Sequence, residues 1–409
     1  VRFMNNSIAE SEGKMKRRIR GRRNMEISAA AVLLGLMLLL SGCGAASVRQ
    51  QTGVDTAMGT IVTQTLYVRQ ERGQTEQESG EEVGTEGESA AVMELLTELE
   101  RQELSWRIEG SEVARINARA SAAAIRDPAG EAAGTDDGIG AGGFAGASAP
   151  MPGEPEGIPV SSSMQDILGQ IWQISTDSKG ALDVTLGRLS RLWNLDELTV
   201  SAVDGQACIP GSEQIQSALE DTGFARVQLS GGTITLPVGM QLDLGAVGKG
   251  IACDRISAYL HSQPQVTGAV VAVGGSVVTY GKKPDGSPWK VGIIHPREEG
   301  NYLGVLSLTG EHFISTSGDY ERYVLVDGVR YHHILDPSTG YPARSGLCSV
   351  TIVCDSGLQA DALSTACFVL GAERGLALAE TYGAEALLVD EDGVLYMTDG
   401  MKEIFSAGR

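Results

Sequence analysis

The feature that most constrains the fold is a run of short apolar segments between residues 269 and 354. Each segment has the length of a β-strand and is rich in β-branched or aromatic residues. Turn signals such as Asp327-Gly328 separate neighbouring segments. Strands joined by hairpins, with helical patterns before and after them, predict an α+β fold of mainly antiparallel sheets packed against helices. The segments are AVVAV, SVVTY, WKVGII, YLGVLSL, RYVLV and LCSVTIVC.

Four further segments predict the elements around this run. Residues 60–68 alternate polar and apolar side chains, which indicates a strand. Apolar residues recur at helical spacing over residues 91–107, 164–175 and 361–382, which predicts three helices. We expect these elements to form a single domain over residues 52–409, preceded by a linker over residues 44–51.

Two stretches of biased composition are predicted to be insertions into this domain. Residues 70–90 are acidic and contain almost no apolar side chains, and residues 120–157 are dominated by Ala, Gly, Pro and Asp. Neither stretch can bury enough apolar surface to offset the entropy lost on ordering, so both are predicted to be flexible loops.

The first 43 residues have the pattern of a signal peptide. A basic region is followed by an apolar stretch over residues 27–40, which is too short to span a bilayer comfortably. The stretch ends in Leu-Ser-Gly-Cys43 and small residues, which resembles the lipobox of bacterial lipoproteins. In a lipobox the cysteine thiol takes a diacylglycerol and becomes the mature N-terminus. An uncleaved anchor helix is the alternative, and either reading places the domain outside the cytoplasm.

Charge and cysteine usage exclude several classes of protein. The net charge of −20 argues against a sequence-independent nucleic-acid binder, which needs a basic surface. The five cysteines after Cys43 have no zinc-site spacing and are predicted to be mostly buried thiols. A bridge between Cys348 and Cys354 remains open, because both lie on one predicted strand.

The segment LDLGAVGKGIACDRI predicts a strand that ends at Leu244, a turn that holds Lys249, and a helix that begins near Ile251. It fails the P-loop template, because Asp243 replaces the first glycine and Gly250 replaces the Ser/Thr. Backbone N–H groups at such a turn stabilise anionic phosphates. A plain strand-to-helix connection is the alternative.

The segment ADALSTACFVLG places Asp361, Ser364 and Thr365 on one face of a predicted helix. A carboxylate and two hydroxyls are hard oxygen ligands of the kind that Mg²⁺ takes, leaving room for substrate phosphates. Ordinary helix capping by Asp and Ser is the alternative.

Two further motifs carry candidate chemistry. His332 and His333 are adjacent on a predicted strand and therefore point to opposite faces, so at most one shares a site with Asp361. A neutral imidazole there would accept a proton from an attacking hydroxyl, although two surface histidines would look the same. The pair Gly274-Gly275 permits close approach of a flat ligand, and a bulge or tight turn explains it equally.

Taken in order, these motifs closely resemble the ApbE family of FAD:protein FMN transferases, also called flavin transferases, in a lipoprotein form. The resemblance runs from Met58 to about Phe405 and implies the ApbE fold, which is similar to the T-fold. The segments that carry it are AMGT, SWRIEGSEVARINA, GALDVTLGRLSRLWNL, LDLGAVGKGIACDR, VGGSVVTYGKKPDGSPWKVGI, ISTSGDYERY, HHILDPSTGYPARSG and ADALSTACFVLG.

The resemblance also implies roles for single residues. The residues that fall where the family contacts FAD are Met58, Ala181, Leu182, Asp183, Asp243, Lys249 and Leu335. The residues that fall on its metal site are Ala246, through the backbone carbonyl, Asp361, Ser364 and Thr365. His333 matches the proposed catalytic base. Trp106 stands where the family commonly has a tyrosine against the flavin, and it keeps the stacking surface but changes the polar group.

The activity implied is Mg²⁺-dependent transfer of FMN from FAD to a Thr or Ser hydroxyl of an acceptor protein, with release of AMP. The acceptors implied are FMN-binding-domain subunits of electron-transfer complexes such as Rnf and Nqr. Two alternatives share the same pocket, namely an FAD pyrophosphatase and an FAD-carrying lipoprotein without turnover. The expected location is the outer side of the bacterial cell membrane, with a lipid on Cys43.

Overall fold

The computed structural model describes residues 2–3, 47–70, 87–125, 157–195 and 209–408. The lipobox cysteine Cys43, residue Cys208 and the central parts of both predicted insertions lie outside the described residues. No helix within those ranges is both long enough and apolar enough to cross a membrane.

The core of the fold is an eight-stranded sheet whose strands pair antiparallel throughout. Three of the seven neighbouring pairs in this sheet are hairpins, whereas the other four are joined by longer connections that contain further strands or helices. Its strands, in spatial order, are β16 (Leu395–Met397), β15 (Glu385–Asp390), β14 (Leu347–Cys354), β11 (His312–Gly318), β8 (Ser276–Gly281), β7 (Val266–Val273), β3 (Thr60–Arg69) and β2 (Val48–Ala57).

Three smaller sheets complete the β-structure. The first is four-stranded, with the order β1 (Arg2–Phe3), β9 (Trp289–Ile294), β10 (Tyr302–Leu308) and β17 (Phe405–Ala407). The second is the hairpin of β12 (Tyr323–Val326) and β13 (Val329–His332). The third has the order β4 (Ile158–Pro159), β6 (Thr233–Thr235) and β5 (Gln228–Ser230).

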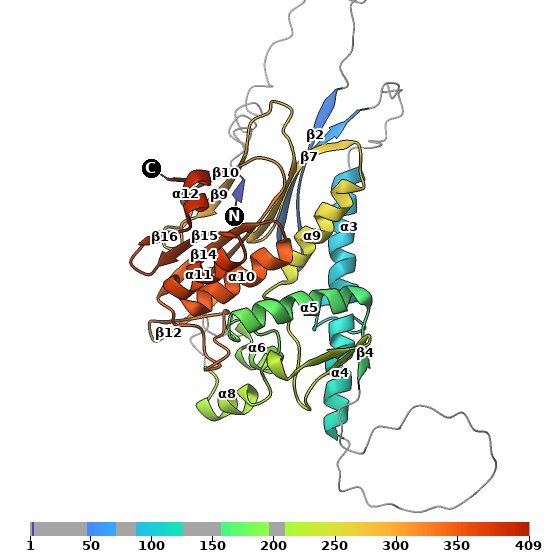
Figure 1. The fold of residues 1–409 in the computed structure, drawn as a ribbon, viewed down its shortest axis with the longest axis vertical. Coiled ribbons are helices and arrows are strands. Elements are labelled where there is room, and N and C mark those ends of the chain that lie inside the picture. Colours follow the sequence, from blue (N-terminus) through green and yellow to red (C-terminus); the bar gives the residue numbers. More distant parts are fainter. Residues whose placement is uncertain (1, 4–46, 71–86, 126–156, 196–208, 409) are drawn as a thin grey trace, which may run out of the picture.

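Helices cover one face of the eight-stranded sheet (Figure 1), and the four-stranded sheet covers the other. Successive side chains of β7 point to opposite faces of the sheet. Val271 packs against the helices, and Val270 packs against the four-stranded sheet. The helices are α3 (Gly87–Leu99), η1 (Glu100–Leu104), α4 (Glu112–Ile125), α5 (Ser162–Asp177), α6 (Gly187–Trp193), α8 (Ser212–Leu219), η2 (Phe224–Arg226), α9 (Gly248–His261), α10 (Gly357–Leu370), α11 (Ala372–Thr381) and α12 (Asp399–Ile404).

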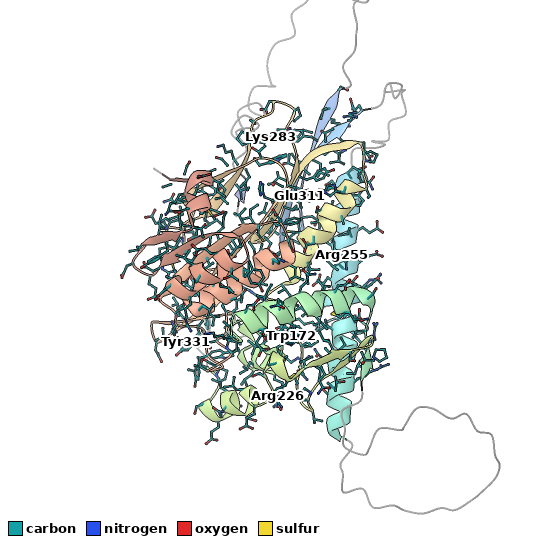
Figure 2. The ribbon with its side chains drawn as sticks, viewed as in Figure 1. Trp172, Arg226, Arg255, Lys283, Glu311 and Tyr331 are labelled. Atoms are coloured by element: carbon teal, nitrogen blue, oxygen red, sulfur yellow. The ribbon has the colours of Figure 1, made fainter. Side chains whose placement is uncertain are left out.

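Polar contacts hold the helical layer together at its edge. Arg255 of α9, which Figure 2 labels, forms an ion pair with Glu103 at the end of η1 at 3.2 Å. The same guanidinium donates to Ser163 of α5 at 2.5 Å. One side chain thus joins three elements that are far apart in the sequence.

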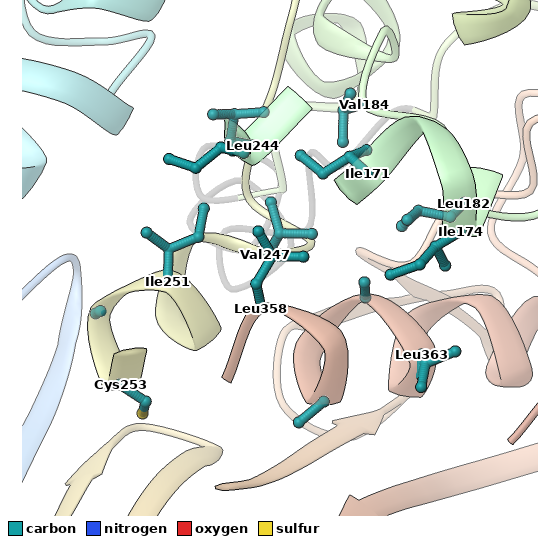
Figure 3. Packing of buried hydrophobic residues seen from close by; sticks show 14 of the residues in the cluster. Ile171, Ile174, Leu182, Val184, Leu244, Val247, Ile251, Cys253, Leu358 and Leu363 are labelled. Carbon is teal, nitrogen blue, oxygen red and sulfur yellow. The ribbon is translucent and has the colours of Figure 1, made fainter. Parts of the chain in front are cut away.

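A shared apolar cluster brings the candidate site segments together (Figure 3). Ile171 of α5, Leu182, Val247, Ile251 of α9 and Leu363 of α10 are all buried in it. Val247 and Ile251 lie on either side of Lys249, and Leu363 lies between Asp361 and Ser364, so packing these apolar side chains in one core draws their polar neighbours to one edge. Burial of such side chains contributes roughly 1.5–3 kcal/mol each.

Several predicted boundaries are wrong. Strand β2 begins at Val48, inside the predicted linker, and is polar and exposed along most of its length. Its position is set by pairing with β3 rather than by apolar residues of its own. Helix α3 begins at Gly87, inside the predicted insertion 70–90, where Glu88 accepts hydrogen bonds from Tyr259 and Gln265.

Three other predicted elements also differ from those in the structure. Helix α4 extends to residue 125, into the predicted insertion 120–157, because its alanine-rich end has high helix propensity. The helix predicted over residues 361–382 is two helices separated at Gly371, whose φ of +84° breaks the first. No strand ends at Leu244, since only an isolated bridge between Leu186 and Gln241 is formed there.

The cysteine prediction is confirmed for the four cysteines that the structure describes beyond Cys43. Cys253, Cys348, Cys354 and Cys367 are free thiols, and all but Cys354 are buried. The possible Cys348–Cys354 bridge is excluded, because both residues lie on β14, about 20 Å apart along the strand.

Candidate active site

The site is organised by the contact between the N-terminal ends of α9 and α10. Gly250 and Gly357 meet backbone to backbone, and a Cβ on Gly250 would collide with the Gly357 carbonyl and lie 2.7 Å from Asp361 Cβ. Asp254 of α9 accepts hydrogen bonds from the backbone N–H groups of Gly357 at 2.6 Å and of Leu358 at 2.8 Å. It thereby satisfies two of the free donors at the start of α10.

Asp361 makes the reciprocal contact. Its Oδ2 accepts from the backbone N–H of Gly250 at 2.9 Å, and its Oδ1 accepts from Ser315 Oγ at 2.7 Å. Asp361 is 3% exposed and lies in the second turn of α10, whose N-cap is Ser356. The capping alternative for Asp361 is therefore wrong for its own helix, and each helix supplies a carboxylate to the start of the other.

Hydroxyl groups from β11 extend this polar cluster along the face of α10. Ser317 Oγ lies 2.8 Å from Ser364 Oγ and 3.3 Å from Thr365 Oγ1. The predicted ligands Asp361, Ser364 and Thr365 thus share one side of the helix with two serines of β11. No described residues form a group of three or more His, Cys, Asp and Glu side chains that could hold a metal.

The backbone carbonyl of Ala246, just before α9, accepts no hydrogen bond from the described residues. In a regular helix the N–H of Gly250 would donate to this carbonyl, four residues earlier. That N–H donates to Asp361 instead, and no donor among the described residues bonds the Ala246 oxygen. The carbonyl is therefore available as an oxygen ligand close to the Asp361 carboxylate.

His333 and His332 occupy different environments, as strand alternation predicts. His332 is 3% exposed, its Nδ1 accepts from the backbone N–H of Ile334 at 3.3 Å, and its Nε2 lies 3.0 Å from the carbonyl of Ala343. The Nε2–H tautomer satisfies both contacts. Burial lowers the pKa of His332 to about 4. His332 is thus a structural residue that is neutral at pH 7.

His333 follows the last residue of β13 and is only partly buried. Desolvation lowers its pKa well below the usual value, and the positive charges of Arg322 and Lys249 lower that pKa further. The imidazole is consequently neutral at pH 7, which is the form that can accept a proton. The charge of Lys249 acts on the pKa of His333, so the first turn of α9 and the end of β13 lie close together.

The predicted flavin-binding residues surround the start of α9. Met58 has a positive φ of 53° and donates its N–H to Glu100 at 3.1 Å. Its Cε lies 3.9 Å from the position of a Cβ on Gly248. Asp243 Oδ1 accepts from Gly245 N–H at 2.9 Å, and its charge acts on the pKa of Arg191.

The remaining predicted contacts are more buried. Ala181, Leu182 and Leu335 each have at most 9% exposure. Both oxygens of Asp183 are engaged within the protein, by Thr185 at 2.7 Å and by the N–H of Phe224 at 3.2 Å. Burial raises the pKa of Asp183. The carboxylate of Asp183 thus links two loops, and a contact with FAD stays a prediction.

The structure describes the surroundings of the glycine pair and of Trp106, whose contact with the flavin stays a prediction. Gly274 has a φ of +59°, and it forms the tight turn between β7 and β8 against Thr60, so the turn alternative is the one found. Two guanidinium groups lie over the ring of Trp106. The Cζ atom of Arg107 is 4.7 Å from the ring centre, and that of Arg191 is 4.6 Å from it.

Sequence reasoning missed four residues of this site, namely Asp254, Ser315, Ser317 and Arg191. The two serines had a visible signal, because hydroxyls alternate in ISTSG with the period of a strand. Asp254 had a weaker signal, as it follows Gly250 by one helical turn. Arg191 had none, because its partners lie far away in the sequence.

Comparison with known proteins shows the family to which this chain belongs. The model of the ApbE family matches residues 58–388. The chain belongs to the ApbE family. A relative from Treponema pallidum named FAD:protein FMN transferase is 30% identical over 381 residues, which cover 88% of this chain and 90% of the relative. A relative of the same name from Escherichia coli K12 is 32% identical over 246 residues, which cover 59% of this chain and 68% of the relative.

Solved ApbE structures share the fold of this ApbE-family protein. The ApbE protein of Thermotoga maritima superimposes with a TM-score of 0.66 at 29% identity, covering 87% of this chain and 99% of the other. The apo flavinyl transferase ApbE of Pseudomonas stutzeri gives 0.65 at 30% identity, covering 88% and 98%. The prediction of one α+β domain with mainly antiparallel sheets is confirmed.

Proposed function

We propose that this flavin transferase moves FMN from FAD to a serine or threonine hydroxyl of an acceptor protein. The acceptor oxygen attacks the phosphorus on the riboflavin side of the diphosphate, and the bond from that phosphorus to the bridging oxygen breaks. AMP leaves with the electron pair, and FMN stays on the acceptor through a phosphodiester. The observation that carries the proposal is the convergence of Asp361, the start of α9 and the neutral His333.

The metal site fits Mg²⁺ by its donor set. Asp361 supplies one carboxylate, Ser364 and Thr365 supply hydroxyls, and Ala246 supplies a carbonyl without a hydrogen-bond donor among the described residues. All are hard oxygen ligands, and a single carboxylate is sufficient for Mg²⁺ when substrate phosphates complete the shell. When bound there, Mg²⁺ neutralises the diphosphate and polarises the reacting phosphorus.

Lys249 and the backbone at the start of α9 add positive charge to the same place. The N-terminal end of a helix carries a partial positive charge that favours phosphate. Lys249 lies within this first turn, and its ammonium group holds the phosphate of the departing AMP as negative charge moves onto it. The arrangement therefore stabilises the charge that develops when AMP departs.

His333 takes the proton of the attacking hydroxyl. Burial lowers the pKa of His333, and the charges of Arg322 and Lys249 lower it further, so that the imidazole is neutral at pH 7 and its lone pair is free when the acceptor arrives. A positioned general base of this kind contributes roughly 10²–10⁴-fold to the rate. His332, by contrast, uses both ring nitrogens within the protein.

The location and the partners belong to the same proposal. A lipid on Cys43 would hold the domain at the outer side of the cell membrane, and a second acyl chain would make that attachment stable. The acceptors would be FMN-binding-domain subunits of membrane electron-transfer complexes of the Rnf or Nqr type. Such acceptors would share the compartment in which a lipid on Cys43 would hold the enzyme.

Intact-mass measurement tests the proposal directly. The full chain is incubated with FAD, Mg²⁺ and a candidate FMN-binding domain, and the domain is expected to gain the mass of FMN less one water. Release of free FMN and AMP without labelling would show a pyrophosphatase instead. Retention of intact FAD by the protein, without turnover, would show a flavin carrier.

A further inference from the structure

A short helix brings an unpaired arginine to the flavin side of the site. Helix α6 is anchored by Trp193, which is 1% exposed and donates to the Gly340 carbonyl at 2.8 Å. At its other end Gly187 packs on the backbone of Gln241, where a Cβ would lie 2.7 Å from the carbonyl oxygen. The helix is thereby held against the segment that leads to Asp243.

Arg191 lies on the last turn of α6, and its guanidinium rests on Trp106. The carbon Cζ of Arg191 is 4.6 Å from the centre of the indole ring. Asp243 is near enough for its charge to raise the pKa of Arg191, although desolvation lowers that pKa overall. Arg191 therefore joins two residues that the family resemblance assigns to FAD.

The donors of Arg191 are not used by the protein. No described residue forms a hydrogen bond or an ion pair with its guanidinium, which has five N–H donors and stays accessible to solvent. Arg188, one turn earlier on α6, pairs with Asp221. The two arginines of this helix differ, because Arg188 is satisfied internally and Arg191 is held in place by an aromatic ring with its N–H groups free.

We propose that Arg191 is an FAD-binding residue that donates to the carbonyl edge of the flavin ring. The proposal rests on the proposed function, because it takes FAD as the substrate. Lys249 and the metal ligands occupy the diphosphate end, whereas Trp106 marks the flavin end. A flavin ring presents a planar edge of carbonyl oxygens and ring nitrogens, and a planar guanidinium matches such an edge with parallel hydrogen bonds.

The test measures binding of FAD and of ADP to the full chain with EDTA present, so that no turnover occurs. Arg191→Met removes the charge and keeps the apolar stem, and it is expected to weaken FAD binding roughly tenfold or more. ADP carries the diphosphate without the flavin, so its affinity should not change. Arg191→Lys keeps the charge but loses the planar fork, and it is expected to recover only part of the loss.

Arg188→Met is the matched control, because it removes one guanidinium from the same helix and should leave FAD affinity unchanged. Equal weakening of FAD and ADP by Arg191→Met would overturn the proposal in favour of a diphosphate contact. Unchanged FAD affinity would overturn it as well. Since binding is measured without an acceptor, a protein that binds FAD but transfers nothing refutes the proposed function and still reports on Arg191.

Discussion

The two ends of the site are built in opposite ways. At the α9–α10 crossing, Asp361 and Asp254 are held by backbone N–H groups, and the contact between the two glycines leaves no room for a side chain at either position. At the flavin end, Trp106 and Arg191 lie nearer the surface, and the guanidinium of Arg191 forms no hydrogen bond or ion pair with the described residues. The phosphate-reacting end is thus organised before substrate binds, whereas the flavin end has donors that substrate must satisfy.

The largest expected effect comes from the rigid end. Asp361→Ala removes the only carboxylate of the proposed metal shell and leaves the N–H of Gly250 without its acceptor. Transfer is expected to fall below detection at any Mg²⁺ concentration. The mutant is assayed by intact mass of the acceptor, with its folding checked by circular dichroism. A folded mutant with the wild-type transfer rate would exclude Asp361 as a metal ligand.

His333→Ala probes the proton-transfer step. A general base at this position predicts single-turnover transfer slowed by roughly 10²–10⁴-fold, with little change in FAD affinity. The rate of the wild type should be constant around pH 7 and fall only as pH drops through the lowered pKa of His333. Loss of FAD binding in the mutant would instead make His333 a ligand contact.

His332 is expected to control stability against acid rather than catalysis. Its pKa is about 4 in the folded protein and 6.5 as the reference value, so the unfolded chain binds more protons between these values. Stability therefore decreases as pH falls from 6.5 to 4, by on the order of 3 kcal/mol. The free energy of unfolding, measured by chemical denaturation across this pH range, should depend less steeply on pH in His332→Gln than in the wild type. Equal slopes for both proteins would contradict the assignment.

Asp254→Asn tests whether the crossing positions Asp361. The amide keeps the size of the side chain but loses the charge that two N–H groups of α10 contact. Stability is expected to fall by about 1–3 kcal/mol. If the start of α10 shifts, the Mg²⁺ concentration for half-maximal transfer should rise while FAD affinity stays constant. Destabilisation without a change in Mg²⁺ dependence would restrict Asp254 to a structural role.

Trp106→Leu should have the smallest effect, because the flavin end has other contacts. FAD affinity is expected to fall about tenfold or less, in line with loss of one aromatic contact and its cation–π partner. Quenching of tryptophan fluorescence by FAD should also decrease in this mutant. If quenching is the same in both proteins, Trp106 does not lie against the flavin.

The sequence by itself determined the fold class and the family. Strand and helix periodicity depend on local side-chain patterns, and motifs such as ADALSTACFVLG occupy short, continuous stretches. Alternation along a strand also separated His332 from His333, and the family resemblance favoured His333. Sequence periodicity did not reveal the start of α3, whose Glu88 is fixed by Tyr259, or the exposed strand β2, which depends on β3.

Only the tertiary structure decided how the site is held. Asp254 and Asp361 each contact the start of the other helix, because α9 and α10 cross at Gly250 and Gly357, which are 107 residues apart in the sequence. Arg191 meets Trp106 because packing of Trp193 fixes the direction of α6. Such contacts join residues that are far apart in the sequence and share no local pattern. They form because burial of the surrounding apolar core stabilises the arrangement of the helices.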